Sequence, residues 1–378
     1  MSRINDLIKE MCPNGVEYVK LEELVDYIQP AKYIVKSTNY DIKYDVPVLT
    51  AGQTFILGYT NEKDGIYYAS ADNPVIIFDD FTTSNHWVDF NFKVKSSAMK
   101  ILISKTDNLF KYIYYCISNI DYVPKEHSRQ WIQVYSQFQI PLPPLKVQDE
   151  IVKILDKLGE LEAELEAELE ARKSQYEFWR GQMFKHKGNS KISDLFKRVK
   201  GTPITAGKMK EIEDPDGKIR IFAGGQTAVN ANLEDIPKAN IIDYPCVIVQ
   251  SRGLIDFVYY DKPFTFKNEM WAYTCNNQVT IKYLYYYLKN NVNHFRKIGT
   301  QMGSMPQISL PVTEKFEIYL PSLEEQKKIV NILDKFEKLI SDISIGLPAE
   351  IELRKKQYEY YRNKLLSFEE LNYETVAW

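Results

Sequence analysis

Cysteine, glycine and proline are scarce in this chain, and each scarcity excludes a class of protein. The four cysteines (Cys12, Cys116, Cys246 and Cys275) stand far apart without a CxxC pair. Neither a disulfide framework nor a cysteine-based zinc site is therefore expected, and the thiols are expected to be reduced. Only 16 glycines and 17 prolines occur among 378 residues, and 44% of the residues are hydrophobic, which predicts a folded protein. This length suits two domains with connecting segments.

Long apolar runs and a basic excess are also missing. No stretch approaches the roughly 18 apolar residues of a membrane span. The start, MSRINDLIKEM, has no apolar signal core, so we expect a cytoplasmic protein without a membrane partner. The net charge is −3, whereas a protein that binds DNA unaided usually carries a basic excess. The acidic excess lies in residues 146–185 and 324–370, so any surface that faces DNA must be local.

Familiar catalytic and ligand motifs are missing as well. The chain has no GxxxxGK[ST] phosphate loop, no HExxH and no G-x-S-x-G, and its four histidines lack ligand spacing. The segment Asp72-Asn73-Pro74-Val75 approaches a methyltransferase motif but lacks the second proline and the aromatic residue. Asp79 and Asp80 are consistent with a nuclease cluster, but a solvated turn is the favoured interpretation. We therefore predict no catalytic residue, no metal site and no cofactor in this chain.

Tyrosine is present in unusual number, with 27 copies. Its side chain combines an apolar ring with a polar hydroxyl, which favours surfaces that bind another molecule. The alternative is a bias toward AT-rich codons, because isoleucine, lysine and asparagine are frequent too. Tyrosine content alone does not decide between these two interpretations.

Two segments of the chain nearly repeat. IPLPPLKVQDEIVKILDK (140–157) returns as IYLPSLEEQKKIVNILDK (318–335), and RKSQYEFWR (172–180) returns as RKKQYEYYR (354–362). A duplication of this kind indicates two copies of one unit. Fainter pairs keep the same order: TAGQT (50–54) with AGGQT (223–227), PVIIF (74–78) with PCVIV (245–249), FKVK (92–95) with FTFK (264–267), and KYIYY (111–115) with KYLYY (282–286). The pattern predicts one scaffold that carries two different variable surfaces.

The strongly repeated segments are predicted to be helical. Apolar residues recur every three or four positions from Val147 to Leu169, and ELEA occurs three times without a breaker, so one helix is expected from about Lys146 to Phe184. The second copy is interrupted at Gly346-Leu347-Pro348, where a kink or a restart is expected. The residues predicted to pair the helices or to meet a partner are Ile151, Leu155, Leu158, Leu161, Leu165, Leu169, Ile329, Leu333, Phe336, Ile340, Ile351 and Tyr358. The alternative for the ELEA array is a solvated, low-complexity helix.

Short β-rich runs lie between the repeats. Residues 46–50, 75–78, 246–250 and 316–320 predict strands, and helices are expected near 109–117 and 281–290. Each globular unit is therefore predicted to be α+β. The expected order is a first domain (1–145), a first long helix (146–185), a second domain (186–323), and a second helix with a tail (324–378).

These motifs resemble one family along the whole chain. LPPLKVQDEIVKILDK, GLPAEIELRKKQ, RKKQYEYYRNKLLSF and the AGGQT-type anchor are similar to the specificity subunit of type I restriction-modification systems. The resemblance implies a non-catalytic subunit whose two target recognition domains read the halves of a split site on double-stranded DNA. It also implies two long antiparallel helices, a coiled coil that spaces the domains and docks two methyltransferase subunits. Restriction subunits can join such an assembly, and S-adenosylmethionine and ATP with Mg belong to the partners.

Base readout requires polar side chains on exposed loops. In the first domain the candidates are Gln53, Thr82, Thr83, Ser84, Asn85, His86, Arg129 and Gln130. In the second domain they are Lys200, Thr202, Gln226, Gln250, Ser251, Arg252, Gln301, Ser304 and Gln307. The run GTQMGSMPQIS (299–309) resembles the family's polar, glycine-containing segment, whereas its counterpart KEHSRQWIQ (125–133) has no glycine. The alternative for each candidate is an ordinary polar surface residue.

Two other function classes remain open from the sequence. One is a structural coiled-coil scaffold, which the two divergent domains disfavour. The other is a catalytic nuclease or methyltransferase with an unfamiliar site, which the missing motifs disfavour.

Overall fold

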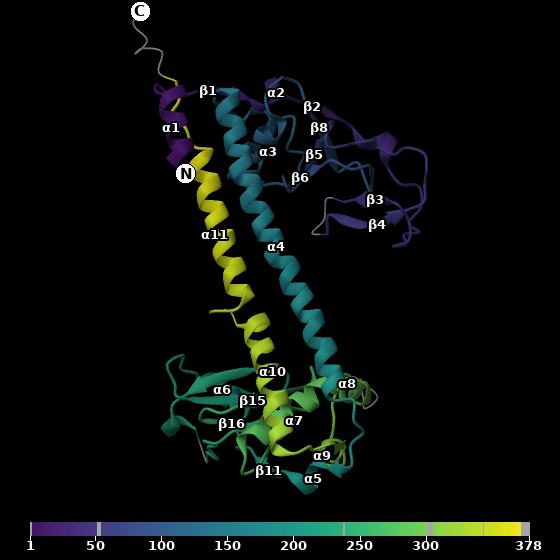
Figure 1. Ribbon diagram of the computed structural model, residues 1–378, viewed down its shortest axis with the longest axis vertical. Coiled ribbons are helices and arrows are strands. Elements are labelled where there is room, and N and C mark those ends of the chain that lie inside the picture. The colour runs from purple at the N-terminus through teal and green to yellow at the C-terminus, as the bar shows by residue number, and fades with distance from the viewer. Residues whose placement is uncertain (1, 51–53, 237–238, 301–304, 343, 372–378) are drawn as a thin grey trace, which may run out of the picture. The chain divides into compact units, whose positions relative to one another are not determined.

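The computed structural model describes residues 2–50, 54–236, 239–300, 305–342 and 344–371 (Figure 1). The chain forms two compact units. The first consists of Met1–Glu164 with Ile351–Trp378, and the second consists of Leu165–Glu350. Each unit therefore contains one globular domain together with parts of the long helices.

The first unit is built on two small sheets. The order in the chain is α1 (Ser2–Met11), β1 (Glu17–Lys20), α2 (Leu21–Leu24), β2 (Val25–Ile28), η1 (Pro30–Tyr33), β3 (Val46–Leu49), β4 (Ile56–Thr60), β5 (Val75–Asp79), β6 (Asn85–Val88), β7 (Lys93–Val94), β8 (Met99–Ser104), α3 (Phe110–Ser118), η2 (Tyr135–Gln137), β9 (Gln139–Leu142) and α4 (Leu145–Met183). One sheet has the order β2-β8-β5-β6, a second has the order β4-β3-β7, and β1 pairs with β9.

The second unit repeats this plan. Its elements are β10 (Ser190–Lys191), α5 (Ile192–Leu195), β11 (Lys197–Lys200), α6 (Ala206–Glu211), β12 (Ile219–Phe222), β13 (Ala228–Ala231), η3 (Leu233–Asp235), β14 (Cys246–Gln250), β15 (Asp256–Tyr260), β16 (Phe264–Phe266), β17 (Trp271–Thr274), α7 (Gln278–Asn290), α8 (Val292–Thr300), α9 (Leu310–Glu314), β18 (Glu317–Ile318) and α10 (Leu323–Ser341). The sheets β11-β17-β14-β15 and β13-β12-β16 match the two sheets of the first unit, and β10 pairs with β18. The α+β prediction and the internal repeat are confirmed.

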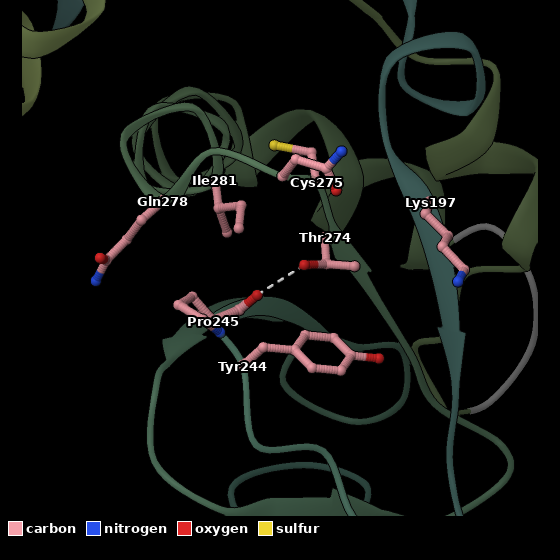
Figure 2. A pocket seen from close by; sticks show the side chains of 8 residues that line it. Lys197, Tyr244, Pro245, Thr274, Cys275, Gln278 and Ile281 are labelled. Carbon is pink, nitrogen blue, oxygen red and sulfur yellow. Dashed lines mark hydrogen bonds between the residues drawn. The ribbon is translucent and has the colours of Figure 1, made fainter.

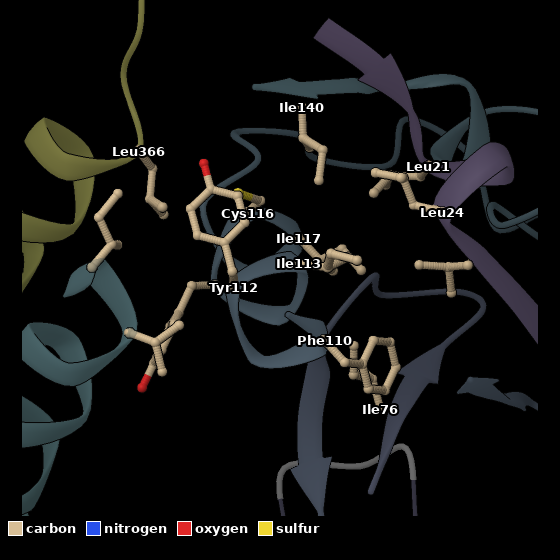
Figure 3. Close-up of a cluster of buried hydrophobic side chains, with 14 of the residues drawn as sticks. Leu21, Leu24, Ile76, Phe110, Tyr112, Ile113, Cys116, Ile117, Ile140 and Leu366 are labelled. Carbon is tan, nitrogen blue, oxygen red and sulfur yellow. The ribbon is translucent and has the colours of Figure 1, made fainter. Parts of the chain in front are cut away.

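The main core of the first unit surrounds helix α3 (Figure 3). Tyr112, Ile113 and Ile117 on this helix are fully buried. They pack with the sheet and with the start of α4, and Leu365 and Leu366 at the end of α11 (Leu347–Leu365) complete the same core. A fully buried aliphatic side chain contributes about 1.5–3 kcal/mol to folding, so this cluster fixes the domain to both helices.

The two domains are attached to their helices by the same contacts. Tyr115 of α3 donates a hydrogen bond to Asp156 of α4, and Lys111 lies 3.8 Å from that carboxylate. In the second unit Tyr286 donates to Asp334 at 2.6 Å, and Lys282 lies 2.7 Å from it. Burial, followed by the hydrogen bond to the carboxylate, raises the pKa of Tyr115, so its hydroxyl remains a donor. The repeated KYxYY and ILDK motifs are therefore one docking contact used twice.

The long helices follow the prediction closely. Helix α4 spans 39 residues, and α10 and α11 span 19 each, so the expected interruption at Gly346 is confirmed. A Cβ atom at Gly346 would stand 2.7 Å from the carbonyl oxygens of Lys338 and Asp342, so a residue larger than glycine would force this break to shift.

The helix contacts run in opposite chain directions. Glu162 of α4 lies 3.8 Å from Lys355 of α11, whereas Tyr176, farther along α4, packs on Phe336 of α10. Later residues of α4 thus meet earlier residues of the C-terminal helices, as antiparallel pairing requires. Among the residues predicted to pair the helices, Ile151, Leu155, Leu333 and Ile351 are buried, and Leu158, Leu161, Leu165, Leu169, Ile329, Phe336, Ile340 and Tyr358 are half-buried.

Candidate nucleic-acid interface

Three segments of the second unit meet just beyond the end of β14. They are the turns 223–227 and 251–255 and the segment 305–308. The backbone N–H of Gly225 donates to Arg252 (2.9 Å), and that of Gly253 donates to Pro306 (2.9 Å). Gly225 and Gly253 have φ angles of +69° and +72°, which a residue with a Cβ atom rarely adopts. The glycines thus allow the segments to lie close together, with Gln226 and Arg252 exposed on their surface.

Arg252 is a free guanidinium on this surface. Its side chain is exposed and makes no hydrogen bond or ion pair with any residue that the structure describes. Its backbone pairs with Gln307 in an isolated antiparallel bridge, which fixes the Cα position while leaving the side chain free. An exposed arginine can donate two hydrogen bonds to the O6 and N7 atoms of guanine. Lys200, at the end of β11, is also exposed.

The first unit repeats one of these contacts beyond β5. The backbone N–H of Gln130 donates to the carbonyl oxygen of Asp80 (2.8 Å), as that of Ile308 donates to Ser251 (2.9 Å) in the second unit. Thr82, Ser84 and Arg129 are exposed here. Thr83 has a φ angle of +63°, an unusual conformation for a β-branched residue. This strain, together with the exposed polar neighbours, marks the turn as a candidate recognition element.

Several predicted base-reading residues are not exposed, and the expectation of exposure is wrong for them. Thr83, Gln130, Thr202, Gln250 and Ser251 are buried. The Thr202 hydroxyl bonds to Thr265 (2.7 Å), and the Gln130 side chain donates to Ser128 and accepts from Tyr122. The Thr83 and Ser251 hydroxyls also donate to backbone carbonyl oxygens of their own domains, so these four side chains hold the loops in place. Gln53, Gln301 and Ser304 lie outside the described residues.

Asn85 and His86 were expected in a loop but lie in strand β6. The His86 ring stacks on Phe55 with the ring centroids 4.0 Å apart, and burial lowers the pKa of this histidine. Asn85 accepts a hydrogen bond from the Ser118 hydroxyl (2.5 Å). Both side chains are half-buried and face their own domain, which leaves the turn before them as the exposed part.

Asp79 and Asp80 are buried, so the expected solvated turn is wrong. Asp79 accepts hydrogen bonds from the Phe81 N–H (2.9 Å) and the Thr82 hydroxyl (2.6 Å). Asp80 pairs with the buried Lys100 (3.5 Å). Within the described residues no group of three or more His, Cys, Asp or Glu side chains is placed to hold a metal ion. Sequence reasoning missed Lys100, although a lysine inside the apolar run MKILI is the signal of a buried ion pair.

A separate cavity of about 440 Å³ opens beside the start of α7 in the second unit (Figure 2). Lys197, Tyr244 and Gln278 supply its polar lining, and the Thr274 hydroxyl donates to the Pro245 carbonyl (2.9 Å) at its wall. Burial raises the pKa of both the Cys275 thiol and the Tyr244 hydroxyl, which favours their neutral forms. None of the predicted base-reading residues lines this cavity.

Comparison with known proteins identifies the family of this duplicated fold. The model of the type I restriction modification DNA specificity domain matches the chain twice, over residues 13–171 and 185–353. The chain belongs to the type I restriction-modification specificity family. It is a non-catalytic specificity subunit with two target recognition domains, one in each matched segment. None of the helices that the structure describes carries an apolar stretch long enough to span a bilayer.

Curated relatives of the family match along nearly the whole length. A type I restriction enzyme specificity subunit from Escherichia coli is 39% identical, over 97% of this chain and 98% of that protein. A putative type I specificity subunit from Haemophilus influenzae is 30% identical, over 93% and 96%. The crystal structure of the S subunit of a type I restriction-modification system from M. genitalium has a TM-score of 0.61 at 14% identity, over 94% of this chain and 97% of that one. This last likeness supports the fold alone.

Proposed function

We propose that each target recognition domain of this specificity subunit reads one half of a two-part site on double-stranded DNA. The observation that supports this proposal is the contact of three segments beyond β14, namely 223–227, 251–255 and 305–308. The hydrogen bond between the turn after the strand and the later segment recurs beyond β5. The backbone hydrogen bonds are equivalent, but the exposed side chains differ: Thr82, Ser84 and Arg129 in one domain, Gln226 and Arg252 in the other. A shared scaffold with unlike polar surfaces suits two different half-sites.

The helix α4 is proposed to set the spacer between the half-sites. It runs without interruption from the first domain to the second, and its middle part is the ELEA array. A single helix has a fixed rise of about 1.5 Å per residue, so the number of residues in α4 would fix the distance between the half-sites. The domains would then face successive major grooves, about one helical turn (~34 Å) apart.

Two methyltransferase subunits are proposed to bind the helices, and restriction subunits are proposed to join them. Phe178 and Trp179 of α4 and Tyr360 of α11 are large apolar side chains that remain about half exposed. Phe178 and Tyr360 hold equivalent places in the repeated RKxQYExxR motifs, which suits two copies of one partner. S-adenosylmethionine, and ATP with Mg, would be bound by those partners in the cytoplasm.

The net charge of the chain supports the proposal that partner subunits contribute to DNA binding. A net charge of −3 provides little of the salt-dependent attraction to phosphates that DNA binding requires. The specificity subunit would supply base contacts, and the partner subunits would supply most of the phosphate contacts.

The proposal is tested by mapping modified bases in DNA from cells that express this chain with its cognate methyltransferase subunit. A motif with two defined halves and a fixed gap is expected. A continuous motif would refute the model of two readers. The same cells without this chain are the control, because modification that persists there would come from another enzyme.

A further inference from the structure

A buried carboxylate lies directly beneath Arg129. The Asp80 side chain is 1% exposed, and its Oδ1 atom accepts the backbone N–H groups of Gln130 (3.2 Å) and Trp131 (2.9 Å). Its Oδ2 atom lies 3.3 Å from Nη1 of Arg129 and 3.5 Å from Nζ of Lys100. One carboxylate thus fixes both the backbone after Arg129 and the guanidinium itself.

The Nη1 atom of the Arg129 side chain is held by neighbouring groups, whereas the side chain as a whole remains half exposed to solvent. Nη1 also approaches the Ser97 carbonyl oxygen (3.5 Å), and the guanidinium lies 5.8 Å from the Phe81 ring. The side chain is nevertheless 50% exposed. Among the described residues, its Nε and Nη2 atoms have no hydrogen-bond partner. These donors are available on a guanidinium whose direction is already set.

Lys100 keeps the arginine's charge available. The Lys100 side chain is 1% exposed, and it balances the charge of Asp80 within the core. The three groups together carry one net positive charge, which belongs to the exposed Arg129. A buried acid without this lysine would neutralise the arginine and weaken its attraction to the negative edge of guanine or to phosphate.

The second domain has no charged residue at the position equivalent to Asp80. The equivalent backbone hydrogen bonds align Asp80 with Ser251, and therefore Arg129 with Gln307 and Phe81 with Arg252. The Ser251 hydroxyl donates to the Glu269 carbonyl oxygen (3.1 Å) and carries no charge. The arginine has thus moved to the facing segment, where no carboxylate among the described residues holds it. The anchor is a feature of the first domain.

We propose that Asp80 is a positioning residue that aims Arg129 at the first half-site and thereby sets its discrimination. Arg129 contacts DNA, whereas Asp80 acts through it. Holding the guanidinium in advance removes part of the entropy that a free arginine loses on binding, and it orients the planar fork for a two-bond contact. This inference rests on the proposed two-part readout.

The test removes the Asp80 carboxylate and the Lys100 ammonium together, so that no unpaired charge is left in the core. Asp80→Asn alone would leave Lys100 buried without a partner, so it is combined with Lys100→Met. The assembled methyltransferase complex is assayed on the mapped site and on duplexes with one altered base pair in either half. We expect discrimination in the first half to fall about tenfold or more, as we also expect for Arg129→Ala, and discrimination in the second half to stay unchanged.

Combining the substitutions distinguishes a positioning role of Asp80 from a purely structural role. Adding Arg129→Ala to the pair Asp80→Asn and Lys100→Met is expected to cause no further loss, because both changes remove one contact. Asp72→Asn, which removes an exposed carboxylate of the same domain, is the matched control and should leave both halves unchanged. Full discrimination in the anchor variant, or an additive further loss with Arg129→Ala, would overturn the proposal.

A second variant guards against misfolding of the anchor pair. Arg129→Lys changes an exposed side chain and keeps the charge beside Asp80, but it lacks the planar fork. It is expected to retain affinity for DNA and to lose discrimination in the first half-site. Retained discrimination would overturn the role of the aimed guanidinium. Failure of the unaltered complex to modify a two-part site would refute the proposed function instead.

Discussion

Arg252 shows how few side chains a recognition surface exposes and how many it uses for support. The Gly225 N–H holds its turn by donating to the Arg252 carbonyl oxygen, and the buried Gln250 and Ser251 precede the arginine. The buried residues support the turn from below, and the arginine side chain reaches solvent. Specificity in such a site depends on the support as much as on the exposed group.

Replacing Arg252 by alanine should relax or abolish discrimination in the second half-site. If the guanidinium makes a two-bond contact with guanine, the loss amounts to about 1–3 kcal/mol. The measurement is methylation of the cognate site and of sites with single changes in that half. Lys208→Ala on α6, a partly exposed residue paired with Glu211, is the control. Unaltered methylation at every near-cognate site would remove Arg252 from the interface.

Residue types indicated the candidate interface only in part. The exposed positions Arg252, Gln226 and Thr82 could be proposed because a polar run follows an apolar strand. The burial of Thr202 could not, because its hydroxyl partner Thr265 lies 63 residues away in the chain. Asp80 is similar, since only the fold brings Lys100 and Arg129 to it. Tertiary contacts, not local patterns, decided which polar groups are satisfied inside.

At the scale of elements, the same helix-to-helix contact appears in both units. Tyr286 of α7 donates to Asp334 (2.6 Å) and to Glu337 (2.9 Å) of α10. Charge-assisted hydrogen bonds of this kind are stronger than neutral ones. The contact therefore determines how firmly the second domain is held to its helix.

Tyr286→Phe should destabilise the second unit by about 1–3 kcal/mol, because two carboxylates lose their buried donor. Thermal or denaturant unfolding measures the change. Tyr360→Phe, at a 59% exposed position, is the control and should have little effect. An equal response of the two variants would show that the α7–α10 contact adds nothing.

Removing one ELEA unit from α4 should alter the length of the unspecified spacer. Four residues shorten a helix by about 6 Å, against ~3.4 Å per base pair, so the gap should change by one or two base pairs. Base-modification mapping would give the new motif, and both half-sites should remain as before. A variant that methylates the same site with an unchanged spacer would contradict the role of the helix as a measure.

The long helices could be predicted from the sequence better than the short strands, although shorter helices such as α1 and α8 were not foreseen either. The apolar spacing and the absence of breakers gave α4 to within one residue at each end, and Gly346 gave the restart. The strand β18 has only two residues where five were expected, and short strands such as β6 and β12 were not foreseen. A run of four residues carries too little periodicity to be recognised, and its pairing partner lies far away in sequence.

On the scale of the whole molecule, the two target recognition domains are proposed to act as separate readers in one chain. Exchanging the residues before Ile140 for those of another family member should change one half-site only. Among the strands that the structure describes, each sheet is formed within one unit. Modification mapping of the chimaera, beside the parent chain, makes the comparison. A change in both halves would show that the domains do not read independently.

The first unit is assembled from two distant stretches of chain, Met1–Glu164 and Ile351–Trp378. Leu365 and Leu366, from the second stretch, are buried in the core around Tyr112. During synthesis these leucines are made only after all of Leu165–Glu350, roughly ten to forty seconds later at ~5–20 residues per second. The domain that is translated first therefore lacks part of its apolar core until the last helix of the chain has been made.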